Sequence, residues 1–114
     1  MKKFTFIGVA VLMIVSCSNP PAKKDRLATA SRQDKNGWIY VHLEGSPSDI
    51  GYQHGYLLAT DIDTSIRAVA YLLQHDTKRD WQFYRQAAKN FLWNKLEPEY
   101  KQEINGIVEG LHAK

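Results

Sequence analysis

The fold of this 114-residue chain is decided by one stretch, Asp49-Ile50-Gly51-Tyr52-Gln53-His54-Gly55-Tyr56-Leu57-Leu58-Ala59. Gly51, Gly55 and Ala59 recur there at every fourth residue, which places them on one face of a helix. A glycine inside a helix costs about 1 kcal/mol relative to alanine, so two at this spacing need a structural reason. A face without side chains lets another backbone approach closely. Because the stretch is too polar for a membrane span, we expect this face to pack on a sheet or on a neighbouring helix.

The residues before this stretch predict a strand followed by a helix start. The segment from Trp38 to Glu44 is rich in aromatic and β-branched residues, as strands are, and Gly45 closes it. Ser46 is suited to cap a helix and Pro47 to occupy its first position. The helix is expected to run from Pro47 to about Leu73, with a bend near Thr60-Asp61.

Two more helices are predicted downstream. Thr77 to Asp80 reads as a second capping box, and Glu97-Pro98 begins the last helix. Gly106 and Gly110 repeat the four-residue spacing of small residues. The fold class is therefore mainly α with one or two N-terminal strands. The apolar residues expected to form the faces of these two helices are Trp81, Tyr84, Ala88, Phe91 and Leu92 in the first and Tyr100, Ile104, Ile107, Val108 and Leu111 in the second.

The N-terminus reads as an export signal. The apolar run from Phe4 to Val15 follows two lysines and is too short to span a bilayer, which needs about 20 residues. It ends in Ser16-Cys17, which resembles the lipidation site of bacterial lipoproteins, although an ordinary signal peptide that carries a cysteine near its end remains the alternative. The expected organisation is a signal at 1–16, a flexible tether at 17–36 and a folded part at 37–114.

An acylated Cys17 predicts a partner and a location. The membrane lipid would hold the protein in the bacterial cell envelope, lipid-anchored and facing the periplasm or the cell surface. A role for Cys17 as an N-terminal nucleophile is disfavoured, because such a residue begins a core strand and Pro20-Pro21 cannot donate to a central sheet.

Composition excludes several other function classes. The net charge is +3, and two of these charges are lysines of the signal, so the rest of the chain carries +1 and no nucleic-acid partner is expected. One cysteine excludes an internal disulfide framework and a thiolate zinc cluster. No pair of histidines has the spacing of a helical metal site. We therefore predict no metal, no cofactor and no catalytic residue within this chain.

His54 is the histidine with the strongest case for a role. It shares a helical row with Ile50 and Leu58 and should face inward. Two interpretations stay open: a hydrogen-bonded core histidine that helps to pack the glycine row, or a residue that lines a substrate pocket. Together with Tyr52 and the two glycines Gly51 and Gly55, it forms the set of pocket or packing candidates.

A family resemblance rests on these same motifs. The segments Gly37 to Pro47 and, above all, Asp49 to Ala59 resemble the N-terminal region of the acyl-coenzyme A:6-aminopenicillanic acid acyltransferase-like family. That family includes autoproteolytic acyltransferases and amide hydrolases and is close to the phospholipase B-like proteins. The segment Glu103 to Leu111 resembles the family's helix that ends in a Gly-Ile-x-x-Gly pattern, so the resemblance covers residues 37–114.

The resemblance implies an αββα sandwich of the N-terminal nucleophile hydrolase type, in which an internal cysteine freed by self-cleavage attacks an amide or ester. That cysteine lies downstream of the matched region, and this chain has none after position 17. The expected partner is then the missing downstream polypeptide of the same domain, whose sheet layers would cover both glycine rows. The alternative is a small non-catalytic surface lipoprotein that acts as a binding module.

Overall fold

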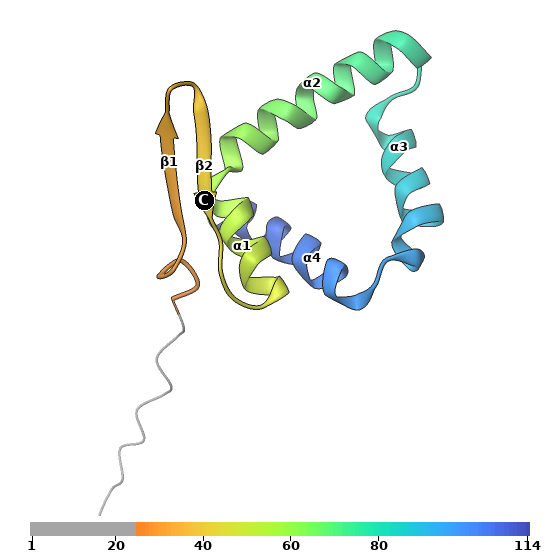
Figure 1. Cartoon of the computed structure of the whole chain (residues 1–114). Coiled ribbons are helices and arrows are strands. Elements are labelled where there is room, and N and C mark those ends of the chain that lie inside the picture. Colours follow the sequence, from red (N-terminus) through yellow and green to blue (C-terminus); the bar gives the residue numbers. More distant parts are fainter. Residues whose placement is uncertain (1–24) are drawn as a thin grey trace, which may run out of the picture.

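The computed structural model describes residues 25–114, which form a two-stranded hairpin followed by helices (Figure 1). In chain order the elements are β1 (Ser31–Lys35), β2 (Trp38–His42), α1 (Pro47–Leu57), α2 (Ala59–Thr77), α3 (Trp81–Ala87), a π-helical segment η1 (Ala88–Leu92), a 3₁₀ segment η2 (Trp93–Lys95) and α4 (Pro98–Ala113). Helix α2 leads away from the hairpin, α3 turns the chain, and α4 returns to lie beside α1 (Figure 1).

The hairpin β1–β2 is antiparallel, and Ser31 pairs with His42 at its open end. Its turn consists of Asn36 and Gly37, whose φ angles of 53° and 80° are both positive. This Asn-Gly pair is the preferred sequence for a two-residue hairpin turn, because both residues adopt left-handed backbone at low cost. The prediction of a flexible tether over 17–36 is thus wrong for residues 31–35, which form a strand.

Helix α1 begins as the sequence predicts. The hydroxyl oxygen of Ser46 accepts a hydrogen bond from the Asp49 N–H at 3.2 Å, and Pro47 is the first helical residue. The helix expected from Pro47 to about Leu73, with a bend near Thr60-Asp61, is instead two helices. The break lies at Leu58, with φ −112° and ψ 19°, and α2 continues to Thr77.

The junction between α2 and α3 also differs from the expected capping box. Thr77 is the last residue of α2, and Lys78 follows with a left-handed φ of 61° while its N–H donates to the Gln74 carbonyl at 3.0 Å. The cap of α3 is Asp80, whose carboxylate accepts the Phe83 N–H at 2.9 Å. Aspartate suits this position because its carboxylate can accept one of the N–H groups in the first turn of the helix, which have no partner within the helix.

Helices α1 and α4 run parallel at backbone contact distance. A Cβ on Gly51 would lie 2.0 Å from the Glu103 carbonyl oxygen, and one on Gly110 would lie 2.2 Å from that of Tyr52. Gly55 meets the backbone of α4, and Gly106 that of α1, in the same way. The two rows thus interlock, each glycine receiving the opposite backbone, as small residues at four-residue spacing do in closely packed helix pairs.

This pairing settles what covers the glycine rows. The expectation that they pack on a neighbouring helix is confirmed, since each row packs on the other. The expectation that missing sheet layers cover them is wrong, because the four glycine positions are already filled by backbone of the same chain. The described residues therefore contain one tightly packed unit, the α1–α4 pair.

No apolar core accompanies this helix pair. Within residues 25–114 no hydrophobic side chain is buried; the buried residues are the four helical glycines and Gln53. Strand β2 exposes apolar side chains on both faces, with Trp38 71% and Tyr40 57% exposed on one and Ile39 43% and Val41 39% on the other. Helix α2 likewise exposes Tyr71 and other apolar residues. The αββα sandwich stays a prediction.

Candidate functional site

Gln53 holds the chain before α1 against the helix. Its side chain is 1% exposed, and its amide nitrogen donates to the carbonyl oxygens of Arg26 at 2.7 Å and Glu44 at 2.8 Å. Its amide oxygen accepts the Glu44 N–H at 2.8 Å. Three backbone groups from two segments thus depend on one side chain, which makes Gln53 the central polar residue of this region.

Arg26 joins the segment before β1 to both paired helices. Its guanidinium donates to the Asp49 carboxylate at 3.1 Å, to the Glu109 carboxylate at 2.8 Å and to the hydroxyl of Ser48 at 2.8 Å. The same group lies 4.2 Å above the centre of the Tyr52 ring. Arginine suits this position because its planar fork can satisfy several acceptors at once.

Arg32 connects the hairpin to the break between α1 and α2. It donates to the Leu57 carbonyl at 3.0 Å and to the Asp61 carboxylate, and it binds both oxygens of Asp34 at 3.0 Å. This hydrogen-bonded guanidinium lowers the pKa of the Asp34 carboxyl, and the two carboxylates raise the pKa of Arg32. The break at Leu58 is thus bridged by a side chain from β1.

The cleft beside Arg26 and Gln53 has a volume of about 340 Å³. Its polar groups bind one another, and no buried polar side-chain atom within residues 25–114 lacks a hydrogen-bond partner. Nor do these residues contain a cluster of histidines and carboxylates that could hold a metal ion. The hydrogen bonds of Arg26 and Gln53 in this cleft join the segment before β1 to the α1–α4 pair.

The sequence-predicted candidates take mainly packing positions. Gly51 and Gly55 are buried against α4, and the half-buried Tyr52 stacks on Tyr56 at 6.2 Å between ring centres. His54 is half-buried, and its carbonyl accepts the Leu58 N–H at 3.0 Å. Cys17, the predicted lipidation site, lies outside the described residues.

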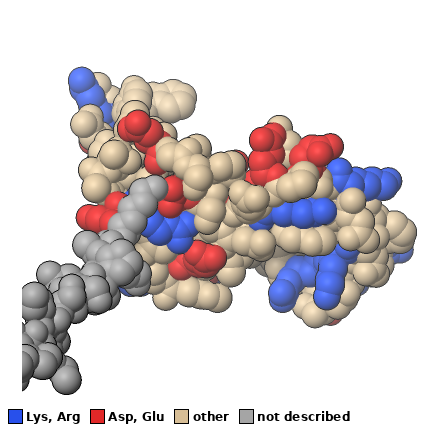
Figure 2. Space-filling view, turned by 90° about the horizontal axis from the view of Figure 1, so that it is seen from below, with Lys and Arg blue, Asp and Glu red and all other residues tan. Residues whose placement is uncertain are grey.

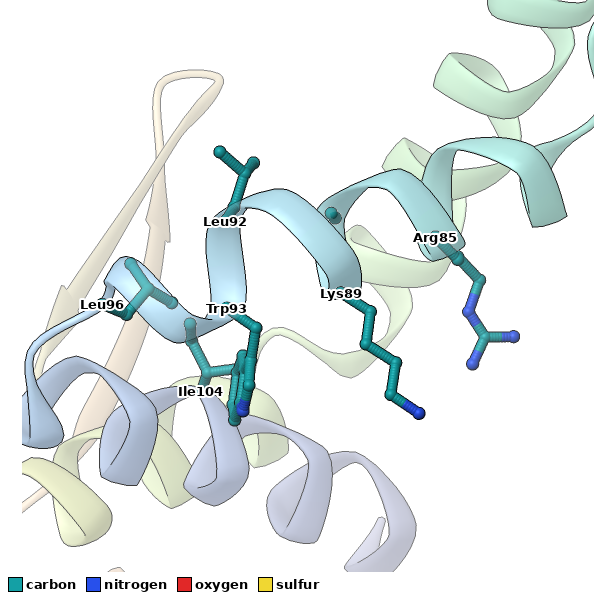
Figure 3. Close-up of a pocket in the computed structure, with 7 residues that line it drawn as sticks. Arg85, Lys89, Leu92, Trp93, Leu96 and Ile104 are labelled. Atoms are coloured by element: carbon teal, nitrogen blue, oxygen red, sulfur yellow. The ribbon is translucent and has the colours of Figure 1, made fainter.

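A second hollow, between the α3–η2 segment and α4, is open and mostly apolar (Figure 3). This groove, as we call it below, has a volume of about 610 Å³. The change from α to π helix at Ala88 and to 3₁₀ helix at Trp93 shapes one wall. The residues that line it are Arg85, Ala88, Lys89, Leu92, Trp93, Leu96 and Ile104.

The charge at this groove is positive. Arg85 and Lys89 point to the same side of the segment (Figure 3), and within residues 25–114 neither forms an ion pair with a carboxylate. Residues 78–95 carry five Lys or Arg and one Asp. Figure 2 shows several blue side chains gathered at the right-hand end of the molecule. The groove therefore combines an apolar lining with a cationic edge.

Sequence reasoning missed Arg26, Arg32, Gln53 and the groove. Only the Asn36-Gly37 turn signalled that residues before it belong to a hairpin. The partners of Gln53 are backbone groups, so no residue type in the sequence predicts them. The groove is lined in part by a π-helical segment, which no sequence pattern predicted. No helix within residues 25–114 has the length and hydropathy needed to cross a membrane.

Comparison with known protein families finds no match, and no solved structure matches the chain. The chain is similar to a protein of Archaeoglobus fulgidus that is described as uncharacterized, with 31% identity over 83 residues. The match covers 66% of this chain and 14% of that protein, so the chain spans about a seventh of its relative.

Proposed function

We propose that residues 25–114 are the N-terminal part of a larger domain, a lipid-anchored amide or ester hydrolase or acyltransferase of the N-terminal nucleophile class. The nucleophile would come from polypeptide beyond this chain, and residues 25–114 would be inactive alone. The anchor would be the acylated Cys17, which would place the enzyme in the bacterial cell envelope.

One observation carries this proposal: strand β2 exposes apolar side chains on both faces. A strand that is apolar on both sides is typical of a sheet covered by layers on each side. Trp38 at 71% exposure and Ile39 at 43% lie on opposite faces, so one additional layer cannot cover both. The αββα sandwich that the family resemblance implies would supply two coverings.

Two further features support the proposal. The relative from Archaeoglobus fulgidus is much longer than the matched region. Both edges of the hairpin are also open to pair with further strands, because β1 and β2 form a sheet of only two strands within residues 25–114.

The alternative, a non-catalytic surface lipoprotein that binds a partner, also has an observation in its favour. The glycine rows of α1 and α4 are complete without further polypeptide. Exposed apolar faces suit a binding module as well as a domain fragment. The two functions differ in whether the complex with the partner hydrolyses or transfers an acyl group.

The test is to coexpress the chain with the polypeptide encoded immediately downstream of it. The proposal predicts a stable complex, a shift of tryptophan emission to shorter wavelength as Trp38 becomes buried, and self-cleavage before an internal cysteine. The complex should then hydrolyse amide or ester substrates, and a serine at the new N-terminal cysteine should abolish this activity. A downstream region that encodes no such cysteine, or a complex that forms without any hydrolysis or acyl transfer, would favour the binding module.

A further inference from the structure

We propose that the groove between the α3–η2 segment and α4 binds a linear alkyl chain that carries a carboxylate at one end. The carboxylate would lie at Arg85 and Lys89, and the alkyl chain would lie along Trp93, Leu96 and Ile104. This site binds a ligand and takes no part in the chemistry proposed above, so the test of the groove does not depend on the test of the proposed function.

The first argument is the order of residues along the groove. Arg85 and Lys89 come from the α3 end, whereas Trp93 and Leu96 come from the η2 end, where Ile104 of α4 joins them (Figure 3). One end is therefore cationic and the other apolar. A ligand with a charged head and an apolar tail matches this order.

The second argument is charge. Covering the groove with an uncharged apolar layer would desolvate Arg85 and Lys89, which have no carboxylate partner within residues 25–114. Desolvating an unpaired cation is costly, so the occupant should bring a negative charge. This requirement separates the groove from strand β2, whose exposed Trp38, Ile39, Tyr40 and Val41 are all uncharged.

The third argument is size. A volume of about 610 Å³ falls within the range of roughly 300–1,000 Å³ that is common for small-molecule sites. The walls are formed by helical segments joined through a short connection at Leu96 and Glu97. An alkyl chain can fill an irregular apolar hollow of this kind.

The test is photocrosslinking of the full chain, held in nanodiscs of zwitterionic lipid, with dodecanoate that carries a diazirine near the end of its alkyl chain. Peptides that contain Trp93 or Ile104 should be labelled above the rest of the chain. Unlabelled dodecanoate should compete, and decanoate should compete roughly four- to sixteenfold less well, because each methylene contributes about two- to fourfold. Dodecanol, which has the same chain without the charge, should compete poorly.

Two double variants distinguish binding in the groove from attraction of the ligand to positive charge anywhere on the protein. Replacing the two groove cations together, Arg85→Gln and Lys89→Gln, should lower the labelling at least about fivefold. Lys78→Gln with Arg79→Gln removes the same charge outside the groove and should change it less than about twofold. Equal loss in both pairs, equal competition by dodecanol, or displacement of the label by a polyglutamate peptide as effective as dodecanoate would each overturn the proposal.

Discussion

Replacing Gly51 with alanine tests how tightly α1 and α4 pack. The new Cβ would lie 2.0 Å from the Glu103 carbonyl oxygen, whereas ordinary contacts begin at 3.4 Å, so the helices have to part by about 1.4 Å. The obstacle is backbone, which cannot rotate away as a side chain can. Overpacking commonly costs about 1–3 kcal/mol, and this case belongs in the upper half of that range.

The helix propensity of alanine acts in the opposite direction. It favours Gly51→Ala by about 1 kcal/mol, so the expected net destabilisation of the pair is about 1–2 kcal/mol. If Gly51→Ala destabilises the pair, the cost of overpacking exceeds the gain in helix propensity; if it stabilises the pair, the propensity gain is the larger. A net cost of this size lowers the population of the packed pair relative to the open pair by a factor of roughly 5–30.

Hydrogen exchange measured by mass spectrometry is the suitable assay, because it reports local opening in a protein without a single cooperative core. Protection of amides in α1 and α4 should fall roughly 5–30-fold in Gly51→Ala, while α2, which makes few contacts with the pair, should be unchanged. The control is Asn105→Ala, an exposed position on α4 that changes propensity alone. Increased protection of α1 and α4 in Gly51→Ala would refute the close packing.

Three further predictions concern the polar contacts that hold the hairpin. Gln53→Met keeps the size of the side chain but leaves backbone groups of Arg26 and Glu44 without partners, and it should cost roughly 2–4 kcal/mol, seen as lost amide protection at Glu44. Arg26→Lys cannot reproduce the contacts of the guanidinium fork and should make thermolysin cleavage near residue 27 about fivefold faster. The pKa of Asp34 should lie below the ordinary aspartate value of about 3.9, and Arg32→Gln should return it there, as followed by carboxyl NMR. Because folding lowers this pKa, the stability it contributes is present above the ordinary value and is lost as pH falls through the lowered one.

Each of these predictions has an outcome that contradicts it. Gln102→Met, at an exposed site on α4, is the control for Gln53→Met, and equal effects of the two would remove the special role of Gln53. Arg67→Gln breaks an exposed pair with Asp63 and should leave the thermolysin rate unchanged. An Asp34 midpoint that does not move in Arg32→Gln would mean that this contact is absent in solution.

Local rules predicted the starts of α1 and α4 and the glycine face of α1. Ser46 and Pro47 begin α1 because capping and proline preferences act within a few residues, and the glycine spacing implied a close backbone neighbour. The sequence near α1 could not show that this neighbour is α4. Helix α4 lies about 50 residues away along the chain, and a row of glycines can pack against the backbone of a helix or a sheet. At the break, the Leu57 carbonyl accepts a hydrogen bond from Arg32, which lies 25 residues away along the chain.

The candidate site was harder to predict than the fold. Gln53 is an ordinary polar residue in sequence, and its importance comes from backbone groups that the folded chain brings to it. The groove is lined in part by the π-helical segment Ala88–Leu92, a departure from α-helix that the residue pattern does not signal. Both features arise from tertiary arrangement rather than from residue pattern.

The central claim is that further polypeptide covers both apolar faces of strand β2 in the working protein. Hydroxyl-radical footprinting of Trp38 and Tyr40 on one face of β2, and of Ile39 and Val41 on the other, measures this cover directly. The account predicts rapid oxidation of both faces in the purified chain and strong protection of both in the protein as its host cell produces it. Protection in the purified chain, or unchanged oxidation in the cell-derived protein, would contradict the claim.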